Sequence, residues 1–127
     1  MNYLKTFFYL SILLLTVSKY SFGQEKDSLV PAVYYFENGK VSSEGSLRKG
    51  KPDGYWKSYY PSGVLKTEGN RKNYLRDGIW KFYTEDAVLY LTIDYVEDKK
   101  SGKRITYRGA NPYKIERFKD DEKEGKG

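Results

Sequence analysis

Apolar and polar residues alternate over short stretches of the chain beyond residue 30, and turn residues separate these stretches. Tyr55 to Tyr60 is one alternating stretch, Pro61 to Gly63 (PSG) is a turn signal, and Leu65 to Arg71 is a second stretch. Short alternating stretches that flank Pro and Gly are typical of β-hairpins. The pattern predicts an all-β domain without helices.

The hairpin pattern recurs at a constant offset. The segment from Asp53 to Tyr59 (DGYWKSY) returns 24 residues later as Asp77 to Tyr83 (DGIWKFY), and Ser101 to Tyr107 (SGKRITY) is a third copy. One frame without an insertion fits residues 34–118, and the Asp-Gly pairs are expected to mark the connections between hairpins. The sequence therefore predicts tandem antiparallel β-hairpin repeats in an elongated meander sheet, although periodicity leaves closure into a small barrel or sandwich open.

Residue chemistry also predicts the strand register. In the second hairpin the predicted pairs are Trp56 with Gly69, Lys57 with Glu68, Ser58 with Thr67 and Tyr60 with Leu65, because an indole can cover a bare glycine backbone while opposite charges pair on the other face. The next hairpin then pairs Trp80 with Ile93, Phe82 with Leu91 and Thr84 with Leu89.

This register assigns alternate residues to opposite faces. The expected core consists of Trp56, Tyr60, Leu65, Trp80, Phe82, Leu89, Leu91 and Ile93. The opposite face is the candidate binding surface, with Tyr55, Lys57, Tyr59, Lys66, Lys81, Tyr83 and Tyr90. Structural roles are expected for Gly54, Trp56, Gly69, Gly78, Trp80 and Gly102.

Residues 1–24 resemble a secretory signal peptide. A short basic start that includes Lys5 precedes an apolar run from Phe7 to Val17, and small and polar residues follow up to Gln24. The alternative is a membrane anchor, but the apolar run is shorter than the roughly 20 residues that span a bilayer. We expect cleavage near Gln24 and an exported product that is periplasmic, in the cell envelope or secreted.

Composition removes several classes of chemistry. The 127 residues include no Cys, which excludes disulfides, a lipid-anchored N-terminal cysteine and thiolate metal sites. They also include no His, the usual general base and the commonest metal ligand. We expect no enzyme activity, no cofactor and no metal.

The net charge of +6 is spread among acidic residues, so most of it is expected to solvate strand faces, and no nucleic acid is expected as a partner. Residues 25–33 are expected to form a linker or an edge strand. Residues 119–127 mix lysines with acids and are expected to form a charged, flexible tail.

The repeat unit resembles a known family. An aromatic residue, a Gly turn, Glu-Gly and then Asp-Gly-x-Trp-Lys-x-Tyr are similar to the MORN repeat variant of bacterial proteins often labelled YwqK-like antitoxins. The resemblance extends from Tyr34 to about Phe118 and implies an elongated hairpin array. It also implies scaffolding or membrane association as possible roles.

These observations lead to a functional expectation. The chain is expected to be an exported, non-enzymatic repeat protein that serves as a protein interaction or scaffold module, because a regular sheet offers a long surface. The alternative is that the exposed Tyr/Lys face binds anionic lipid or cell-wall glycan.

Overall fold

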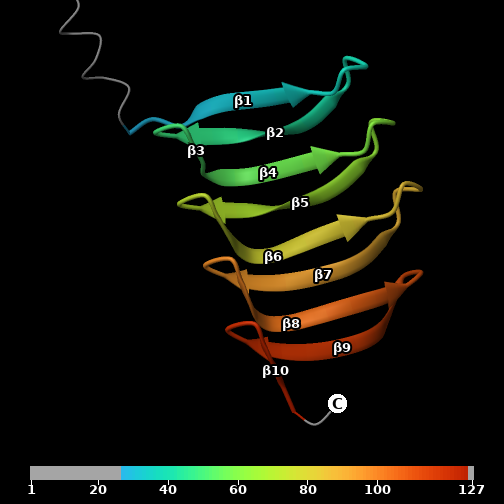
Figure 1. The fold of residues 1–127 in the computed structure, drawn as a ribbon. Coiled ribbons are helices and arrows are strands. Elements are labelled where there is room, and N and C mark those ends of the chain that lie inside the picture. The colour runs from blue at the N-terminus through green and yellow to red at the C-terminus, as the bar shows by residue number, and fades with distance from the viewer. Residues whose placement is uncertain (1–26, 126–127) are drawn as a thin grey trace, which may run out of the picture.

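A computed structural model of the chain describes residues 27–125, and in this part the fold is one antiparallel sheet without helices (Figure 1). The strands follow the chain in the order β1-β2-β4-β5-β6-β7-β8-β9-β10, and the short β3 pairs with β2 alone. The strands are β1 Val30–Tyr35, β2 Val41–Arg48, β3 Lys51–Pro52, β4 Gly54–Tyr59, β5 Leu65–Lys72, β6 Leu75–Tyr83, β7 Leu89–Val96, β8 Lys99–Arg108, β9 Asn111–Lys119 and β10 Glu122–Glu124.

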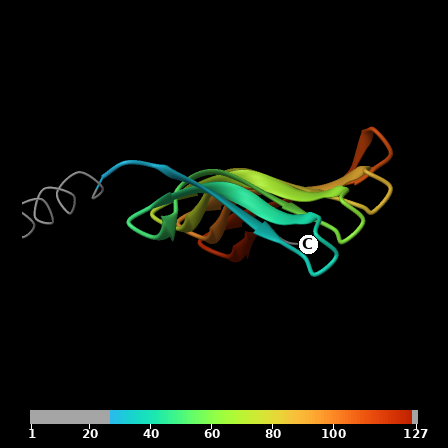
Figure 2. The same cartoon turned by 90° about the horizontal axis from the view of Figure 1, so that it is seen from above.

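The sheet is open: the predicted meander is confirmed, and the described strands do not close into a barrel. Its first and last strands lie at opposite ends of the stack in Figure 1. Figure 2, which looks along the stack, shows that the strands arch instead of running flat. No described residue belongs to a helix that is long and apolar enough to span a membrane.

The predicted register is confirmed in the middle of both central hairpins. Trp56 faces Gly69, Lys57 faces Glu68 and Ser58 faces Thr67 between β4 and β5. Between β6 and β7, Trp80 faces Ile93 and Phe82 faces Leu91.

The register prediction is wrong at the loop ends of these hairpins. Leu65 faces Tyr59 instead of Tyr60, and Leu89 faces Tyr83 instead of Thr84. The cause is a β-bulge in each second strand, where Lys66 or Tyr90 is an extra, unpaired residue.

The loop explains the bulge in the second hairpin. The Gly63 amide donates to the Tyr60 carbonyl at 2.8 Å, and Gly63 has a φ of 95°, which places it in the left-handed region that favours glycine. The Tyr60 amide then donates to the Val64 carbonyl at 2.8 Å. The loop thus closes on Val64, and the strand accommodates the spare residue at Lys66.

The connections between hairpins are two-residue turns that the sequence prediction misplaced. Asn73 and Tyr74 both have positive φ, 50° and 61°, which is the conformation of a tight type I′ turn. The equivalent pairs are Lys49 with Gly50, Glu97 with Asp98 and Asp120 with Asp121. Each Asp-Gly pair lies four residues after a turn pair, as Asp77-Gly78 lies after Asn73-Tyr74. The pairing between β5 and β6 shifts in register near Gly78, whose φ is 76°. The Asp-Gly pairs bend the chain after the turn and do not form it.

The last hairpin departs from the 24-residue frame by one residue. Gly78 faces Tyr95, but the equivalent Gly102 faces Phe118 instead of Lys119. The reason is a shorter loop, since Arg108 and Asn111 are paired on either side of only two residues.

Both ends of the repeat region extend further than residues 34–118. Of the two alternatives for residues 25–33, an edge strand forms from Val30 onward. The flexible tail expected from Lys119 is instead ordered through β10, which pairs with β9, because the turn at Asp121 is fixed by a hydrogen bond of 2.9 Å from its amide to the Lys100 carbonyl. The predicted signal peptide lies outside the described residues.

The core lies on one face of this single layer. Trp56, Trp80, Ile93 and Tyr95 are buried, with 5 to 7% of their surface exposed. Ala32, Leu47, Phe82 and Leu91 pack against them. The expected core residues Tyr60, Leu65 and Leu89 are only half-buried because they lie at the bulged ends, and Tyr95 was missed.

Candidate interaction surface

Strand alternation separates two faces of the sheet. The Trp face carries the rows of Trp56, Ser58, Thr67, Trp80, Phe82, Leu91 and Ile93. The Tyr/Lys face carries Tyr55, Lys57, Tyr59, Glu68, Ile79, Lys81 and Tyr83. Residues that are adjacent in the chain therefore act on opposite sides of the same backbone.

On the Trp face each indole covers a glycine of the preceding hairpin. A Cβ added to Gly69 would overlap the Trp80 ring, and a Cβ added to Gly45 would overlap the Trp56 ring. The Trp80 Nε1 donates to the Asn70 carbonyl at 3.0 Å, and Trp56 Nε1 donates to Ser46 in the same way at 3.1 Å. The expectation that Trp56 covers its facing residue Gly69 is therefore wrong, because the ring leans back across the junction between hairpins.

On the Tyr/Lys face the residue before each glycine holds tyrosines. Glu44 accepts a hydrogen bond of 2.9 Å from the Tyr59 hydroxyl, and Glu68 accepts one of 3.1 Å from Tyr83. Tyr55 also donates to Glu68. Burial, reinforced by these glutamates, raises the pKa of Tyr55 and of Tyr59 to about 12. Each Glu-Gly dipeptide thus joins neighbouring hairpins on both faces.

Charge alternates across the middle of the Tyr/Lys face. Glu44 faces Lys57, Lys57 faces Glu68 and Glu68 faces Lys81 on four successive strands. Opposite charges on directly facing residues stabilise a strand pair by a few tenths of a kcal/mol up to about 1 kcal/mol. Pairing and the tyrosine bonds therefore explain why Glu44 and Glu68 recur at one repeat position.

The structure gathers most of the predicted binding residues. Tyr55, Lys57, Tyr59, Lys81 and Tyr83 form one surface around the glutamates. Tyr55 is 50% exposed and Lys81 is exposed, whereas Lys57, Tyr59 and Tyr83 are half-buried. The remaining two, Lys66 and Tyr90, are exposed at the bulges near the loops.

One exposed residue of this surface was missed by the sequence reasoning. Ile79 stands one repeat after Tyr55, faces Asp94 and is 61% exposed. The 24-residue offset was the available signal, because it places Ile79 on the face of Tyr55.

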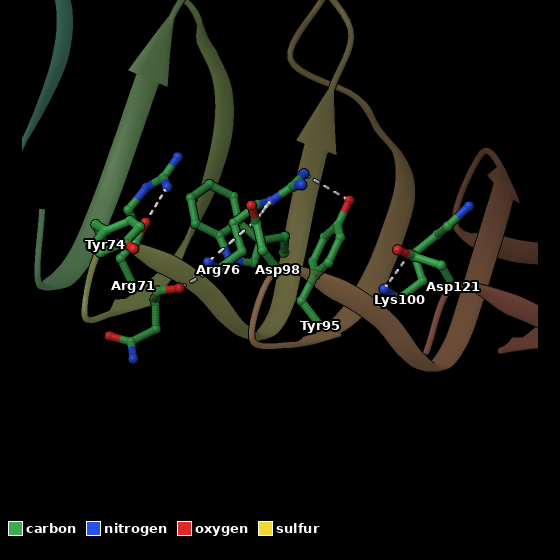
Figure 3. A network of polar contacts seen from close by, with 9 residues as sticks. Arg71, Tyr74, Arg76, Tyr95, Asp98, Lys100 and Asp121 are labelled. Carbon is green, nitrogen blue, oxygen red and sulfur yellow. Dashed lines mark hydrogen bonds and ion pairs between the residues drawn. The ribbon is translucent and has the colours of Figure 1, made fainter. Parts of the chain in front are cut away.

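The turns between hairpins form a second ladder along one edge of the array (Figure 3). The Tyr74 amide donates to the Pro52 carbonyl at 2.8 Å and the Asp98 amide to the Arg76 carbonyl at 3.0 Å. Arg76 also pairs with the Asp98 carboxylate, which lowers the pKa of that carboxyl, and donates to the Tyr95 hydroxyl at 2.9 Å. Residues 27–125 contain no group of three or more His, Cys, Asp or Glu side chains that could hold a metal ion.

Comparison with known families supports the repeat assignment. Residues 31–49 and residues 52–73 match the family model of the MORN repeat variant. These matches cover the hairpins β1–β2 and β4–β5, and the later hairpins repeat the same architecture beyond the matched residues. A search of curated proteins finds no match to the chain. The resemblance to YwqK-like antitoxins stays a prediction.

Proposed function

We propose that the chain is an exported, non-enzymatic interaction module that holds another protein on its Tyr/Lys face. The observation that carries this proposal is a set of bulky side chains left in solvent on a rigid, regular sheet. Ile79 is 61% exposed, Tyr55 is 50% exposed and Tyr90 is 39% exposed.

The chemistry of this face suits a protein partner. Tyrosine is among the residues that supply most of the binding energy in protein interfaces, and surrounding charged groups guide the partner. Ile79 is an exposed apolar residue on this face, and Lys81, two residues further along β6, places a positive charge beside it. A partner that covers Ile79 and Tyr55 would remove from water apolar surface that the folded chain leaves exposed.

Site-specific photocrosslinking tests the proposal. A benzophenone amino acid placed at Ile79 should crosslink one protein in the native host, and excess purified wild-type chain should suppress that product. The matched control places the same probe at Val88, which is 46% exposed in a loop between strands. Equal products from both positions, or none from Ile79, would contradict the proposed face.

Vesicle sedimentation examines the other function expected of this face. Vesicles that contain anionic phosphatidylserine should not sediment the chain at physiological salt beyond the level seen with neutral phosphatidylcholine. Sedimentation that Lys66→Gln and Lys81→Gln together abolish would assign the face to membranes instead of a protein.

Export is part of the proposal and has its own test. Expression with the native leader should give a mature chain that starts close to Gln24 or Glu25, as measured by intact mass. Recovery of a chain that still begins at Met1 in the membrane fraction would indicate an uncleaved anchor.

A further inference from the structure

The Trp face is hollowed between the two tryptophans. The cavity has a volume of about 490 Å³, within the range of about 300 to 1,000 Å³ of small-molecule sites. Its lining includes Trp56, Ser58, Thr67, Arg71, Tyr74 and Trp80. We call this cavity the Trp notch. A smaller hollow continues from it beside Arg71, Trp80 and Phe82.

The notch exists because one hairpin has small side chains where the next has large ones. Ser58 and Thr67 face each other in the β4–β5 hairpin, whereas Phe82 and Leu91 occupy the equivalent positions in the β6–β7 hairpin. The two hydroxyls are hydrogen-bonded to each other and form a polar floor. Phe82 and Leu91 instead pack against the core, so large apolar side chains at these positions fill the space that the second hairpin leaves open.

Arg71 departs from its repeat position in the same hairpin. Its equivalents are Leu47 and Tyr95, which both belong to or pack against the core. The Arg71 guanidinium lies 5.2 Å from the centre of the Trp80 ring, and Nη1 donates to the Tyr74 carbonyl at 2.7 Å (Figure 3). A cation therefore replaces an apolar side chain at the wall of the notch.

In the described part of the chain Arg71 forms no direct ion pair, in contrast to three other arginines of the array, although the Asp98 carboxylate lines the smaller hollow with it and favours its charged form. Arg48 pairs with Asp53, Arg76 with Asp98 and Arg104 with Glu116, but none of the ion pairs within residues 27–125 involves Arg71. Burial lowers the pKa of the Arg71 guanidinium, which stays charged. A carboxylate would offset the cost of keeping this charge partly out of water, and a guanidinium binds a carboxylate through two parallel hydrogen bonds.

We propose that the Trp notch binds a carboxylate carried on a short apolar or aromatic frame. Arg71 pairs with the carboxylate, one hydroxyl of the bonded Ser58–Thr67 pair donates to its other oxygen, and the narrow exposed edges of Trp56 and Trp80 border the frame. This site lies on the face opposite the proposed protein surface, so the two proposals stand or fall separately.

Tryptophan fluorescence measures binding directly, because both tryptophans of the chain line the notch. The probe is 3-phenylpropionate, titrated into the full chain, and 3-phenylpropanamide is its neutral control. Emission should change with a saturable dependence on the acid, and the amide should bind at least about tenfold more weakly, a difference of about 1.4 kcal/mol.

Two variants test separately the charge of Arg71 and the open volume of the notch. Arg71→Leu installs the residue found at Leu47 and should weaken binding of the acid at least about tenfold. Thr67→Leu installs the residue found at Leu91, fills the notch and leaves Arg71 in place, and it should weaken binding to a similar extent. Arg117→Leu removes the same charge from the exposed β9 and should change nothing.

A peptide that ends in phenylalanine identifies the natural source of the carboxylate. Tighter binding than 3-phenylpropionate by a peptide with a free C-terminus, lost on amidation, assigns the notch to chain ends, and weaker binding assigns it to small acids. The proposal is overturned if the amide binds as well as the acid, if Arg71→Leu and Thr67→Leu both keep wild-type affinity, or if the acid gives no saturable change.

Discussion

The central junctions and the last junction of the array keep similar strand pairing with different chemistry. At the central junctions Trp56 covers Gly45 and Trp80 covers Gly69. One repeat later, Ile93 stands in the glycine position and Arg104 in the tryptophan position, yet they face each other in the sheet. The comparison shows that a hairpin array needs a filled junction and does not need a particular pair of residues to fill it.

Beyond the last junction, a charged cluster surrounds Arg104 and joins β8 to β9 inside the last hairpin. Arg104 pairs with Glu116 at 2.8 Å, and Lys114 and Lys123 lie 3.1 Å and 3.3 Å from the same carboxylate. Hydrogen bonds from Arg104, and then from the two lysines, lower the pKa of Glu116 to about 2. The central junctions should therefore resist salt and acid, whereas the last hairpin should respond to both.

The largest effect is expected at a central junction. Trp80→Ala removes a side chain that is 5% exposed, together with its hydrogen bond to Asn70, and should lower the free energy of unfolding by about 3 to 5 kcal/mol. Lys81→Ser changes the next residue, which is exposed, and should cost about 0.5 kcal/mol or less. Denaturant unfolding measures both, and a reversed order would show that the core lies on the other face.

The charged cluster of the last hairpin should be less costly to break. Arg104→Ala removes a partly exposed ion pair and should destabilise the protein less than Trp80→Ala does. Its cost should shrink in 1 M NaCl, while the cost of Trp80→Ala should not. If both losses kept the same size across this range of salt, charge would not be what stabilises the last hairpin.

Acid should remove the contribution of Glu116. Because its folded pKa is about 2, below its ordinary value of 4.5, its contribution to stability is complete above pH 4.5 and is lost as the pH falls toward 2. Glu116→Gln should therefore melt below wild type at pH 7 and close to wild type near pH 2. A gap between the two melting temperatures that persisted undiminished at pH 2 would contradict this assignment.

The smallest effect is expected on the Tyr/Lys face. Tyr59→Phe removes the hydroxyl that donates to Glu44 and should cost about 1 kcal/mol or less. In the wild type the Tyr59 phenol should titrate near pH 12, so its stabilisation is present below pH 10 and is lost as the pH rises through 12. NMR of ring-labelled tyrosine follows this titration, and a Tyr59 pKa near 10 would argue against the bond to Glu44.

The sequence predicted the array because its repeat carries both spacing and pairing chemistry. Trp56 facing Gly69 and Lys57 facing Glu68 are consistent in only one register, so one residue of slip was already excluded. The bulges at Lys66 and Tyr90 were not predictable in this way, since an extra residue at a strand end leaves the middle of the hairpin unchanged. The shortened last loop does shift its hairpin by one residue, but the last repeat has Arg104 in place of the Trp whose pairing indicated the register elsewhere.

Two features of the candidate sites depend on side-chain direction, which periodicity does not contain. Register places Trp56 beside glycines on both neighbouring strands, and only the structure shows that its ring lies on Gly45. Arg71 is an ordinary polar residue near a turn in the sequence. Its position over the Trp80 ring, which places a cation at the wall of the Trp notch, is visible only in the structure.

A double-mutant cycle on Gly69 and Trp80 tests the central claim that each indole requires the bare glycine beneath it. The backbone of Gly69 does not need glycine, because its φ is not among the positive values, so only the ring opposes a side chain there. All four proteins are unfolded by denaturant in the same concentration of trimethylamine oxide, which stabilises the weakest of them. Gly69→Ala should cost about 1 to 3 kcal/mol beside Trp80 and nothing, or become stabilising, beside Trp80→Ala. An equal cost in both backgrounds would contradict the account.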